Sequence, residues 1–169
     1  MLSGIKKTTG ADLSALLEGL AEAGVEFILV GGLAAVVQGS PVTTMDVEIV
    51  HSRTFGNIIR LMGFLKSIGA VYRRPDDKVI EPTETDLSEM GHMLFTTRLG
   101  PVDVLAFIEE GKVYEDLLEH TVEIPFRGHF IRVLDLKMLI ELKRMSGDLK
   151  DCRRLPVLEE TLRQIYRQK

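Results

Sequence analysis

Residues 27–50 read FILVGGLAAVVQGSPVTTMDVEIV, and this stretch decides the fold. A short apolar run ends at Gly31-Gly32, a run of small apolar residues follows, and a second, β-branched run then encloses Asp46 and Glu48. Because side chains alternate between the two faces of a strand, these two carboxylates share one face and their apolar neighbours share the other. The order predicts a strand, a glycine turn, a short helix and a second strand with an acidic face.

The rest of the chain continues with alternating helical and strand-like patterns. No Gly-x-Gly-x-x-Gly follows the first strand, and Gly31-Gly32 is not followed by the Gly-Lys-Ser/Thr of a Walker phosphate loop. We therefore predict an α/β (α+β) fold with a mixed β-sheet flanked by helices and with C-terminal helices. We expect one domain over residues 1–169, with a core at about 26–134 and a helical segment at about 135–169. The expected strands are 26–30, 45–50, 93–97, 102–107, 122–125 and 130–133, and the expected helices are 13–20, 33–38, 54–68, 112–119, 136–143 and 155–165, with a strand and a long loop within 70–90.

Composition limits the partners and the compartment. The 169 residues are 45% apolar and carry a net charge of −4, which gives no global basic field for a nucleic-acid duplex. The longest apolar stretch, residues 27–37, is well short of the ~20 residues that a bilayer crossing needs. The single cysteine, Cys152, cannot form an internal disulfide. We expect a cytoplasmic protein that makes no membrane contact.

A third carboxylate gives the acid pair a chemical meaning. Asp103 lies between Val102 and Val104, so it too is a charge inside a β-branched run. If its strand neighbours that of Asp46, side chains across the strands would lie roughly 5 Å apart. Three carboxylates on one open face suit a hard cation such as Mg²⁺ and the two-metal chemistry of phosphoryl transfer. The alternative is that Asp46 and Glu48 only cover the solvent face of a strand.

Gly31-Gly32 would supply the complementary half of such a site. Glycine lets a backbone approach a ligand closely, and the helix expected to begin near Leu33 presents free N–H groups and the positive end of its dipole. A triphosphate would then lie between this helix start and the metal ions. The alternative is an ordinary strand-to-helix turn.

This arrangement resembles the polymerase-β-type nucleotidyltransferase superfamily. Its pattern is an apolar residue, Gly, Gly or Ser, nine to thirteen residues, then Asp-apolar-Asp/Glu-apolar, with a third acid on a later strand. The resemblance implies a Mg²⁺-dependent nucleotidyltransferase that moves a nucleoside monophosphate from an NTP to an acceptor hydroxyl. It implies that Asp46, Glu48 and Asp103 are the catalytic and metal-binding residues, and that Gly31 and Gly32 bind the nucleotide.

The tail extends the resemblance to small bacterial nucleotidyltransferase-like proteins. Those proteins carry a Leu-Lys-Arg segment and a Lys-Asp pair, which here are Leu142-Lys143-Arg144 and Lys150-Asp151. A lysine in such a helix reaches nucleotide phosphates in related families, which makes Lys143 a nucleotide-binding candidate. The alternative is a solvated basic helix face beside Glu141.

Four positions depart from the patterns of these relatives. Val42 stands where many have arginine, Gly32 where many active members have serine, Asp148 where arginine is common and Arg154 where aspartate is common. None of the four removes a metal ligand, but the loss of a cation near the phosphates would weaken triphosphate binding.

The departures support a second hypothesis, and the acceptor is open. The chain would then be a catalytically weakened binding module with the nucleotidyltransferase fold that acts as the partner of another protein, for example in a toxin–antitoxin pair. A third hypothesis is a plain α+β domain with a chance motif.

If the protein is an enzyme, the sequence leaves its acceptor open, because a small molecule, an RNA end and a protein side chain all fit. Arg73-Arg74 would either be solvated or hold an acceptor phosphate if its loop folds over the site.

Overall fold

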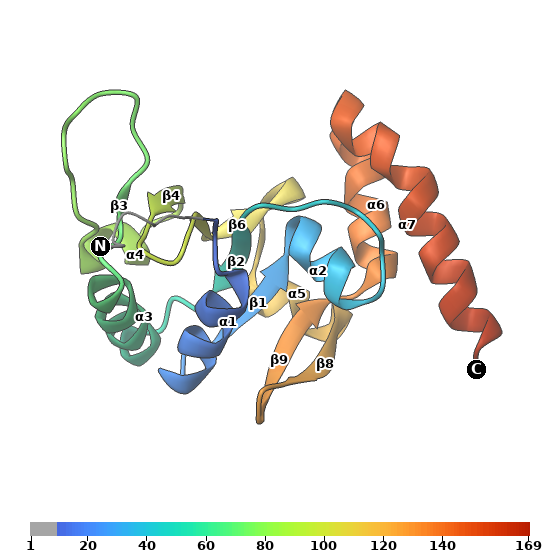
Figure 1. Ribbon diagram of the computed structural model, residues 1–169, viewed down its shortest axis with the longest axis horizontal. Helices are drawn as coiled ribbons and strands as arrows, with labels where there is room; N and C mark the ends of the chain where they lie inside the picture. The colour runs from blue at the N-terminus through green and yellow to red at the C-terminus, as the bar shows by residue number, and fades with distance from the viewer. Residues whose placement is uncertain (1–9) are drawn as a thin grey trace, which may run out of the picture.

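The computed structural model describes residues 10–169 and contains a seven-stranded sheet with helices packed against it (Figure 1). In chain order the elements are α1 (Leu13–Glu22), β1 (Phe27–Val30), α2 (Gly31–Val37), β2 (Val47–His51), α3 (Phe55–Ser67), β3 (Val71–Tyr72), α4 (Glu84–Ser88), β4 (His92–Thr96), β5 (Val102–Leu105), β6 (Phe107–Ile108), the 3₁₀ turn η2 (Glu109–Gly111), β7 (Lys112–Val113), α5 (Tyr114–Leu117), the 3₁₀ turn η3 (Leu118–His120), β8 (Thr121–Phe126), β9 (His129–Leu134), α6 (Leu136–Ser146) and α7 (Leu149–Arg167).

The sheet is mixed, with the strand order β3-β4-β5-β2-β1-β9-β8. At its centre β2 pairs antiparallel with β1 and parallel with β5, and β1 pairs parallel with β9. Strands β6 and β7 form a separate two-stranded sheet. The predicted α/β (α+β) class, a mixed sheet flanked by helices, is confirmed.

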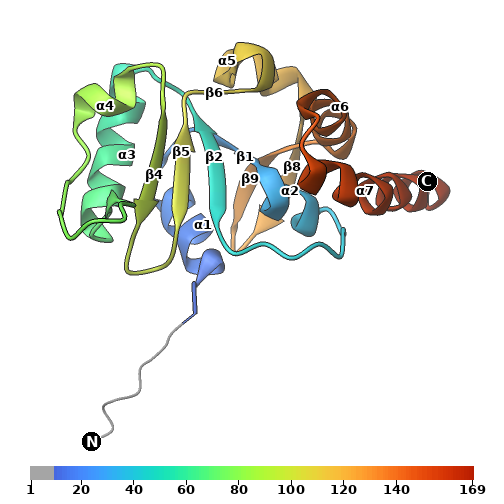
Figure 2. The same cartoon turned by 90° about the horizontal axis from the view of Figure 1, so that it is seen from above.

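Helices lie at both sides of this sheet, and the central strands are buried. All four residues of β1 and all four of β5 are buried. Helix α1 contacts β9, β2 and α3, while α2 contacts β1, β2 and α6. The paired tail helices α6 and α7 lie at the opposite end of the sheet from α3 and α4 (Figure 2). Among residues 10–169, no helix combines the length and the apolar character that a bilayer crossing requires.

Local signals explain several element boundaries. Asp12 accepts a hydrogen bond from the backbone N–H of Ala15 and so caps the start of α1. The β8–β9 hairpin turns at Arg127-Gly128, both of which have positive φ, 47° and 83°, as a two-residue type I′ turn requires. These boundaries follow from residues within a few positions of one another, which is why the sequence predicts them.

The structure corrects the predicted boundaries in several places, among them the start of the last helix, which is Leu149 and not 155, and the start of β2, which is Val47 and not 45. The stretch 70–90 holds the short helix α4, which begins with a reciprocal capping box between Thr83 and Asp86. Helix α2 begins at Gly31, so the glycine pair forms its first turn instead of preceding it. The strand predicted over 102–107 ends at Leu105, and β6 follows after a bend. The helix predicted over 112–119 is divided among β7, α5 and η3.

Asn57 in α3 ties the start of β1 to the end of β2. Its Oδ1 accepts a hydrogen bond from the backbone N–H of Glu26 at 2.6 Å, and its Nδ2 donates to the carbonyls of Glu26 and Ser52 at 2.9 and 2.7 Å. The side chain is fully buried. It therefore supplies hydrogen bonds to the Glu26 N–H and to the carbonyls of Glu26 and Ser52.

We predict that Asn57→Ala lowers the free energy of unfolding by about 2 to 4 kcal/mol. It leaves the Glu26 N–H and the Ser52 carbonyl without this partner, and the Glu26 carbonyl keeps only its bond from the Ser52 N–H. Urea unfolding followed by circular dichroism measures this change. The matched control is Lys66→Ala, an exposed position on the same helix, where we expect a change within about 0.5 kcal/mol. Equal effects at the two positions would contradict the role assigned to Asn57.

Candidate functional site

The three predicted acids come from neighbouring strands. Asp46 directly precedes β2, Glu48 lies within β2, and Asp103 lies within β5. In the parallel β2–β5 pair Glu48 is the register partner of Asp103. Since hydrogen-bonded strands lie about 4.8 Å apart, the structure brings the backbones of Glu48 and Asp103 together from positions far apart in the sequence.

Gly31 lies directly against the acid on β2. The preceding residue, Val30, is the register partner of Glu48, and Gly31 itself has a φ of +72°. A Cβ atom built on Gly31 would overlap the Glu48 carboxylate oxygen Oε2. Only glycine combines this backbone conformation with this close approach. The β1–α2 turn and the acidic strand therefore form one packed unit.

Two adjoining cavities meet at the acids. One has a volume of about 580 Å³ and the other about 560 Å³. The first is lined by Asp103 and by apolar side chains of β4, β5 and α6, and the second by Asp46 and by residues 43–45 of the loop before β2. Four residues line both cavities, namely Gly32, Glu48, Lys150 and Arg154. The cavity of about 580 Å³ is called the first cavity, and the cavity of about 560 Å³ the second cavity.

The acids interact electrostatically. Burial, and then the carboxylates of Asp46 and Asp103, raise the pKa of Glu48 to about 7. Burial also raises the pKa of Asp103, and a hydrogen bond and the positive charge of Arg73 oppose that rise. A cation bound between the carboxylates would relieve this repulsion and favour their ionised forms.

The donor chemistry fits a hard divalent cation. Such ions prefer carboxylate oxygens, and the absence of a Cβ on Gly31 lets the Glu48 carboxylate lie against the β1–α2 turn. Within residues 10–169, however, no three histidine, cysteine, aspartate or glutamate side chains already converge as a metal-binding group. Arg73 instead donates a hydrogen bond to Asp103 Oδ1 at 3.0 Å. The three carboxylates are thus close on the backbone without being gathered around one point.

Lys143, the nucleotide-binding candidate on α6, lines the first cavity. Its Nζ donates to Asp151 Oδ1 at 2.9 Å, and Ser146 Oγ donates to Asp151 Oδ2 at 2.7 Å. Burial pushes the pKa of Asp151 upward, but these two hydrogen bonds outweigh it and the pKa lies below its usual range. The positive charge of Lys143 also opposes the rise in the Glu48 pKa. The Leu-Lys-Arg and Lys-Asp motifs therefore meet in space beside the acids.

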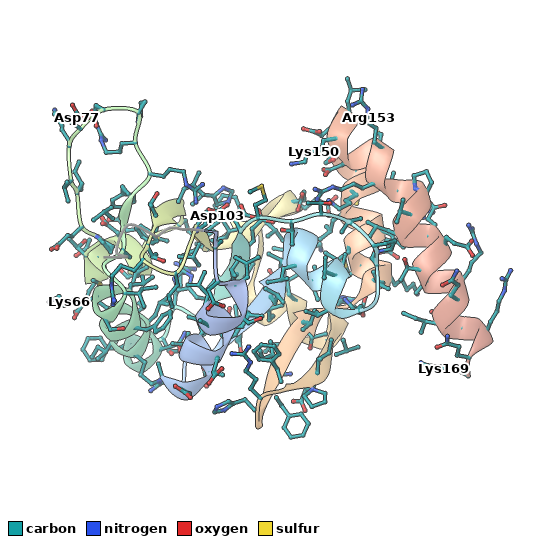
Figure 3. All side chains as sticks on the ribbon, in the orientation of Figure 1. Lys66, Asp77, Asp103, Lys150, Arg153 and Lys169 are labelled. Carbon is teal, nitrogen blue, oxygen red and sulfur yellow. The ribbon has the colours of Figure 1, made fainter. Side chains whose placement is uncertain are left out.

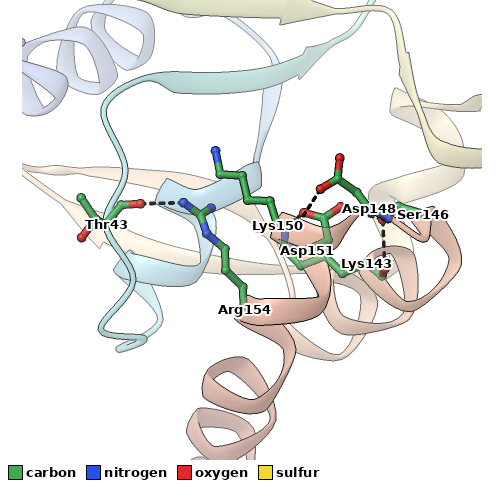
Figure 4. Close-up of polar contacts among 7 residues, drawn as sticks. All are labelled: Thr43, Lys143, Ser146, Asp148, Lys150, Asp151 and Arg154. Atoms are coloured by element: carbon green, nitrogen blue, oxygen red, sulfur yellow. Dashed lines mark hydrogen bonds and ion pairs between the residues drawn. The ribbon is translucent and has the colours of Figure 1, made fainter.

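Sequence reasoning missed two cations of α7. Arg154 donates to the carbonyl of Thr43 at 2.9 Å, and its Nη1 lies 3.3 Å from the position of a Cβ on Gly32 (Figure 4). Lys150, one turn earlier, is directed toward the sheet, whereas Arg153 is directed away from it (Figure 3). The available signal was the i, i+4 spacing of Lys150 and Arg154, which puts both on one helix face. That spacing alone does not indicate what the face packs against.

Asp148 has a structural role that explains one departure from the family pattern. Its Oδ1 accepts a hydrogen bond from the backbone N–H of Lys150 at 2.7 Å, so it caps the start of α7. An arginine could not accept this hydrogen bond. The residue therefore sets where α7 begins, and with it the positions of Lys150 in the first turn and Arg154 in the second.

The fold is that of nucleotidyltransferases. Over 92% of the chain it superposes on 99% of the lincosamide antibiotic adenylyltransferase LnuA in its lincomycin-bound form, with a TM-score of 0.60 and 14% identity. A protein of Thermotoga maritima named as a candidate nucleotidyltransferase matches with a TM-score of 0.54 and 16% identity over 93% of this chain and 91% of that one. The antibiotic-resistance factor ANT(2'')-Ia matches with a TM-score of 0.53 and 12% identity over 89% and 82%. No protein-family model and no curated protein matches the sequence.

We predict that Gly31→Ala lowers the free energy of unfolding by about 2 kcal/mol or more, because alanine is strained at a positive φ and its Cβ displaces the Glu48 carboxylate. Chemical denaturation measures the loss. Gly63→Ala is the control: this exposed glycine of α3 has open space around its Cα, so alanine there should leave stability unchanged or raise it by up to about 1 kcal/mol. A neutral Gly31→Ala would contradict the close packing described here.

Proposed function

We propose that this protein is a nucleotidyltransferase that uses a divalent cation, with Mg²⁺ as the expected ion, to transfer a nucleoside monophosphate from an NTP to an acceptor hydroxyl. The observation that carries the proposal is the parallel β2–β5 pair, which sets Glu48 beside Asp103 and next to the Gly31 turn. The likeness in fold to three solved structures named as nucleotidyltransferases or resistance factors supports it.

In this proposal Asp46, Glu48 and Asp103 hold the cation, which supplies charge stabilisation to the phosphates when it is bound. The acceptor oxygen bonds to the α-phosphorus of the NTP, the bond from that phosphorus to the bridging oxygen breaks, and pyrophosphate leaves. In this proposal the carboxylate of Asp103 accepts the proton of the acceptor hydroxyl.

The cations of the tail are proposed to bind the triphosphate. Lys150 and Arg154 line both cavities, and Arg154 lies against Gly32 at the start of α2. Guanidinium and ammonium groups form strong charge-assisted hydrogen bonds with phosphate oxygens. Lys143 would act from the first cavity. These residues would supply the positive charge that Val42 does not.

The first cavity is proposed to hold the acceptor. Asp103 lines it together with Leu94, Leu105 and Phe107, so a hydroxyl beside the acid would adjoin an apolar surface. Its volume of about 580 Å³ is in the range of small-molecule sites. LnuA, which shares the fold, was solved with the small molecule lincomycin bound. We therefore propose a small hydroxyl-bearing molecule with an apolar portion, in preference to an RNA end or a protein side chain.

The proposal is tested by thermal unfolding with ATP, CTP, GTP or UTP, each with and without Mg²⁺, followed by a pyrophosphate-release assay with a panel of hydroxylated antibiotics that includes lincomycin. Stabilisation by a nucleotide only in the presence of Mg²⁺ supports the enzyme. The absence of stabilisation at saturating nucleotide would contradict it and would favour the binding-module hypothesis.

We predict that Asp46→Asn lowers turnover by at least about a hundredfold, because one anionic ligand of the proposed cation is lost, while the circular dichroism spectrum stays unchanged. Asp77→Asn is the control, since Asp77 is an exposed carboxylate in the loop after β3 (Figure 3), and turnover should stay at the level of the unmodified protein. Full transfer activity in Asp46→Asn would refute the assignment.

We predict that Arg154→Ala weakens NTP binding about tenfold or more, because a charge-assisted contact to phosphate is lost. Arg153→Ala removes the same charge from the adjacent position and should change the dissociation constant by no more than about twofold. Isothermal titration with the nucleotide selected above measures both. Equal effects would mean that only the overall charge of α7 matters.

A further inference from the structure

Arg73 is bound at two points beside the third acid. Its backbone N–H donates to the carbonyl of Leu94 at 2.8 Å, which extends the β3–β4 pairing by one residue. Its Nη2 donates both to the carbonyl of Phe95 at 2.9 Å and to Asp103 Oδ1 at 3.0 Å. Backbone and side chain together fix the guanidinium against the carboxylate.

This ion pair lies at the boundary between the two cavities. Asp103 lines the first cavity and Arg73 lines the second. The Asp103 side chain is only 10% exposed, whereas that of Arg73 is 38% exposed. The carboxylate is therefore buried and held in place, while its partner is accessible from the cavity that Asp46 and Glu48 also line.

We propose that Arg73 is a positioning residue that competes with the divalent cation for Asp103 and thereby sets the affinity of the site for that cation. This inference rests on the proposed function, in which Asp103 is a metal ligand. Until a cation binds, the guanidinium neutralises the third carboxylate and holds one of its oxygens. When a cation binds, it must either displace Arg73 from Oδ1 or share the carboxylate with a nearby positive charge, and both lower its affinity.

A purely structural role is the competing explanation. The hydrogen bond from Arg73 to Phe95 would then serve only to hold the residue after β3 against β4. Under that explanation, removal of Arg73 destabilises the protein and leaves cation binding as it was. Competition makes the opposite prediction for cation binding, so the two explanations are separable by a binding measurement.

The first test measures Mn²⁺ binding by electron paramagnetic resonance, with Mn²⁺ as the probe for the site. Arg73→Gln should lower the Mn²⁺ dissociation constant about tenfold, because one positive charge is removed beside the ion. The constant of Arg73→Lys should lie between those of the unmodified protein and Arg73→Gln. Arg74→Gln is the matched control, because Arg74 pairs with Asp76 in the exposed loop. An unchanged constant in Arg73→Gln, or equal tightening in Arg74→Gln, would overturn the proposal.

The second test asks whether the effect operates through Asp103. In an Asp103→Asn background, Arg73→Gln should change the Mn²⁺ dissociation constant by less than about twofold, because the group that the arginine blocks is already lost. Undiminished tightening in that background would overturn the proposal.

Thermal unfolding supplies a check that does not depend on activity. Without metal, Arg73→Gln should unfold at a lower temperature than the unmodified protein, because the buried Asp103 carboxylate loses its partner. With Mn²⁺ its unfolding temperature should rise by more than that of the unmodified protein. A lower unfolding temperature accompanied by an equal Mn²⁺ response would support the structural explanation instead.

Different results would refute the competition by Arg73 alone and the proposed metal site as a whole. If the unmodified protein binds Mn²⁺ and Mg²⁺-dependent nucleotide stabilisation is seen, but Arg73→Gln has an unchanged Mn²⁺ constant, only the competition by Arg73 is refuted. If neither the unmodified protein nor any variant binds Mn²⁺, the proposed metal site and the role of Arg73 are refuted together.

Discussion

The candidate site depends on one backbone interaction, the parallel pairing of β2 with β5. It sets Glu48 in register with Asp103 although the two residues are far apart in the chain. Burial, and then repulsion from the carboxylates of Asp46 and Asp103, raise the pKa of Glu48 to about 7. The folded protein tolerates this electrostatic repulsion because Asp103 pairs with the guanidinium of Arg73 and because cavities open beside both carboxylates.

Gly32 and Arg154, two of the departures described in the sequence analysis, are neighbours in space, so they are best explained together. A Cβ on Gly32 would lie 3.0 Å from Thr44 and 3.3 Å from Arg154 Nη1, so a serine there would crowd both residues. The sequence pattern has serine and aspartate at these two positions, whereas this chain has Gly32 and Arg154. The absence of a side chain on Gly32 leaves room for the guanidinium of Arg154. In this chain the positive charge beside Gly32 therefore comes from Arg154 of α7, and Val42 in the loop before β2 supplies none.

The sequence predicted what depends on local pattern and missed what depends on contacts across the fold. Alternation and spacing identified the strands that carry Glu48 and Asp103, because side-chain period is a local property, although β2 begins only after Asp46. Helix α4 is an exception, because its capping box between Thr83 and Asp86 is a local signal that the prediction of a loop there overlooked. The partners of Arg73 and Arg154 were not predictable, because each depends on strand register or helix packing over a separation of 30 residues or more.

Those long-range contacts explain why the site belongs to the whole chain and not to the β1–α2–β2 segment alone. The segment supplies Gly31, Asp46 and Glu48, but the guanidinium beside Asp103 comes from the end of β3 and the cations beside Gly32 come from α7. Helix α7 is held there by its packing against α6 and by the hydrogen bond from Arg154 to the Thr43 carbonyl. A shift of α7 would therefore move positive charge and the loop before Asp46 together, because one hydrogen bond joins them.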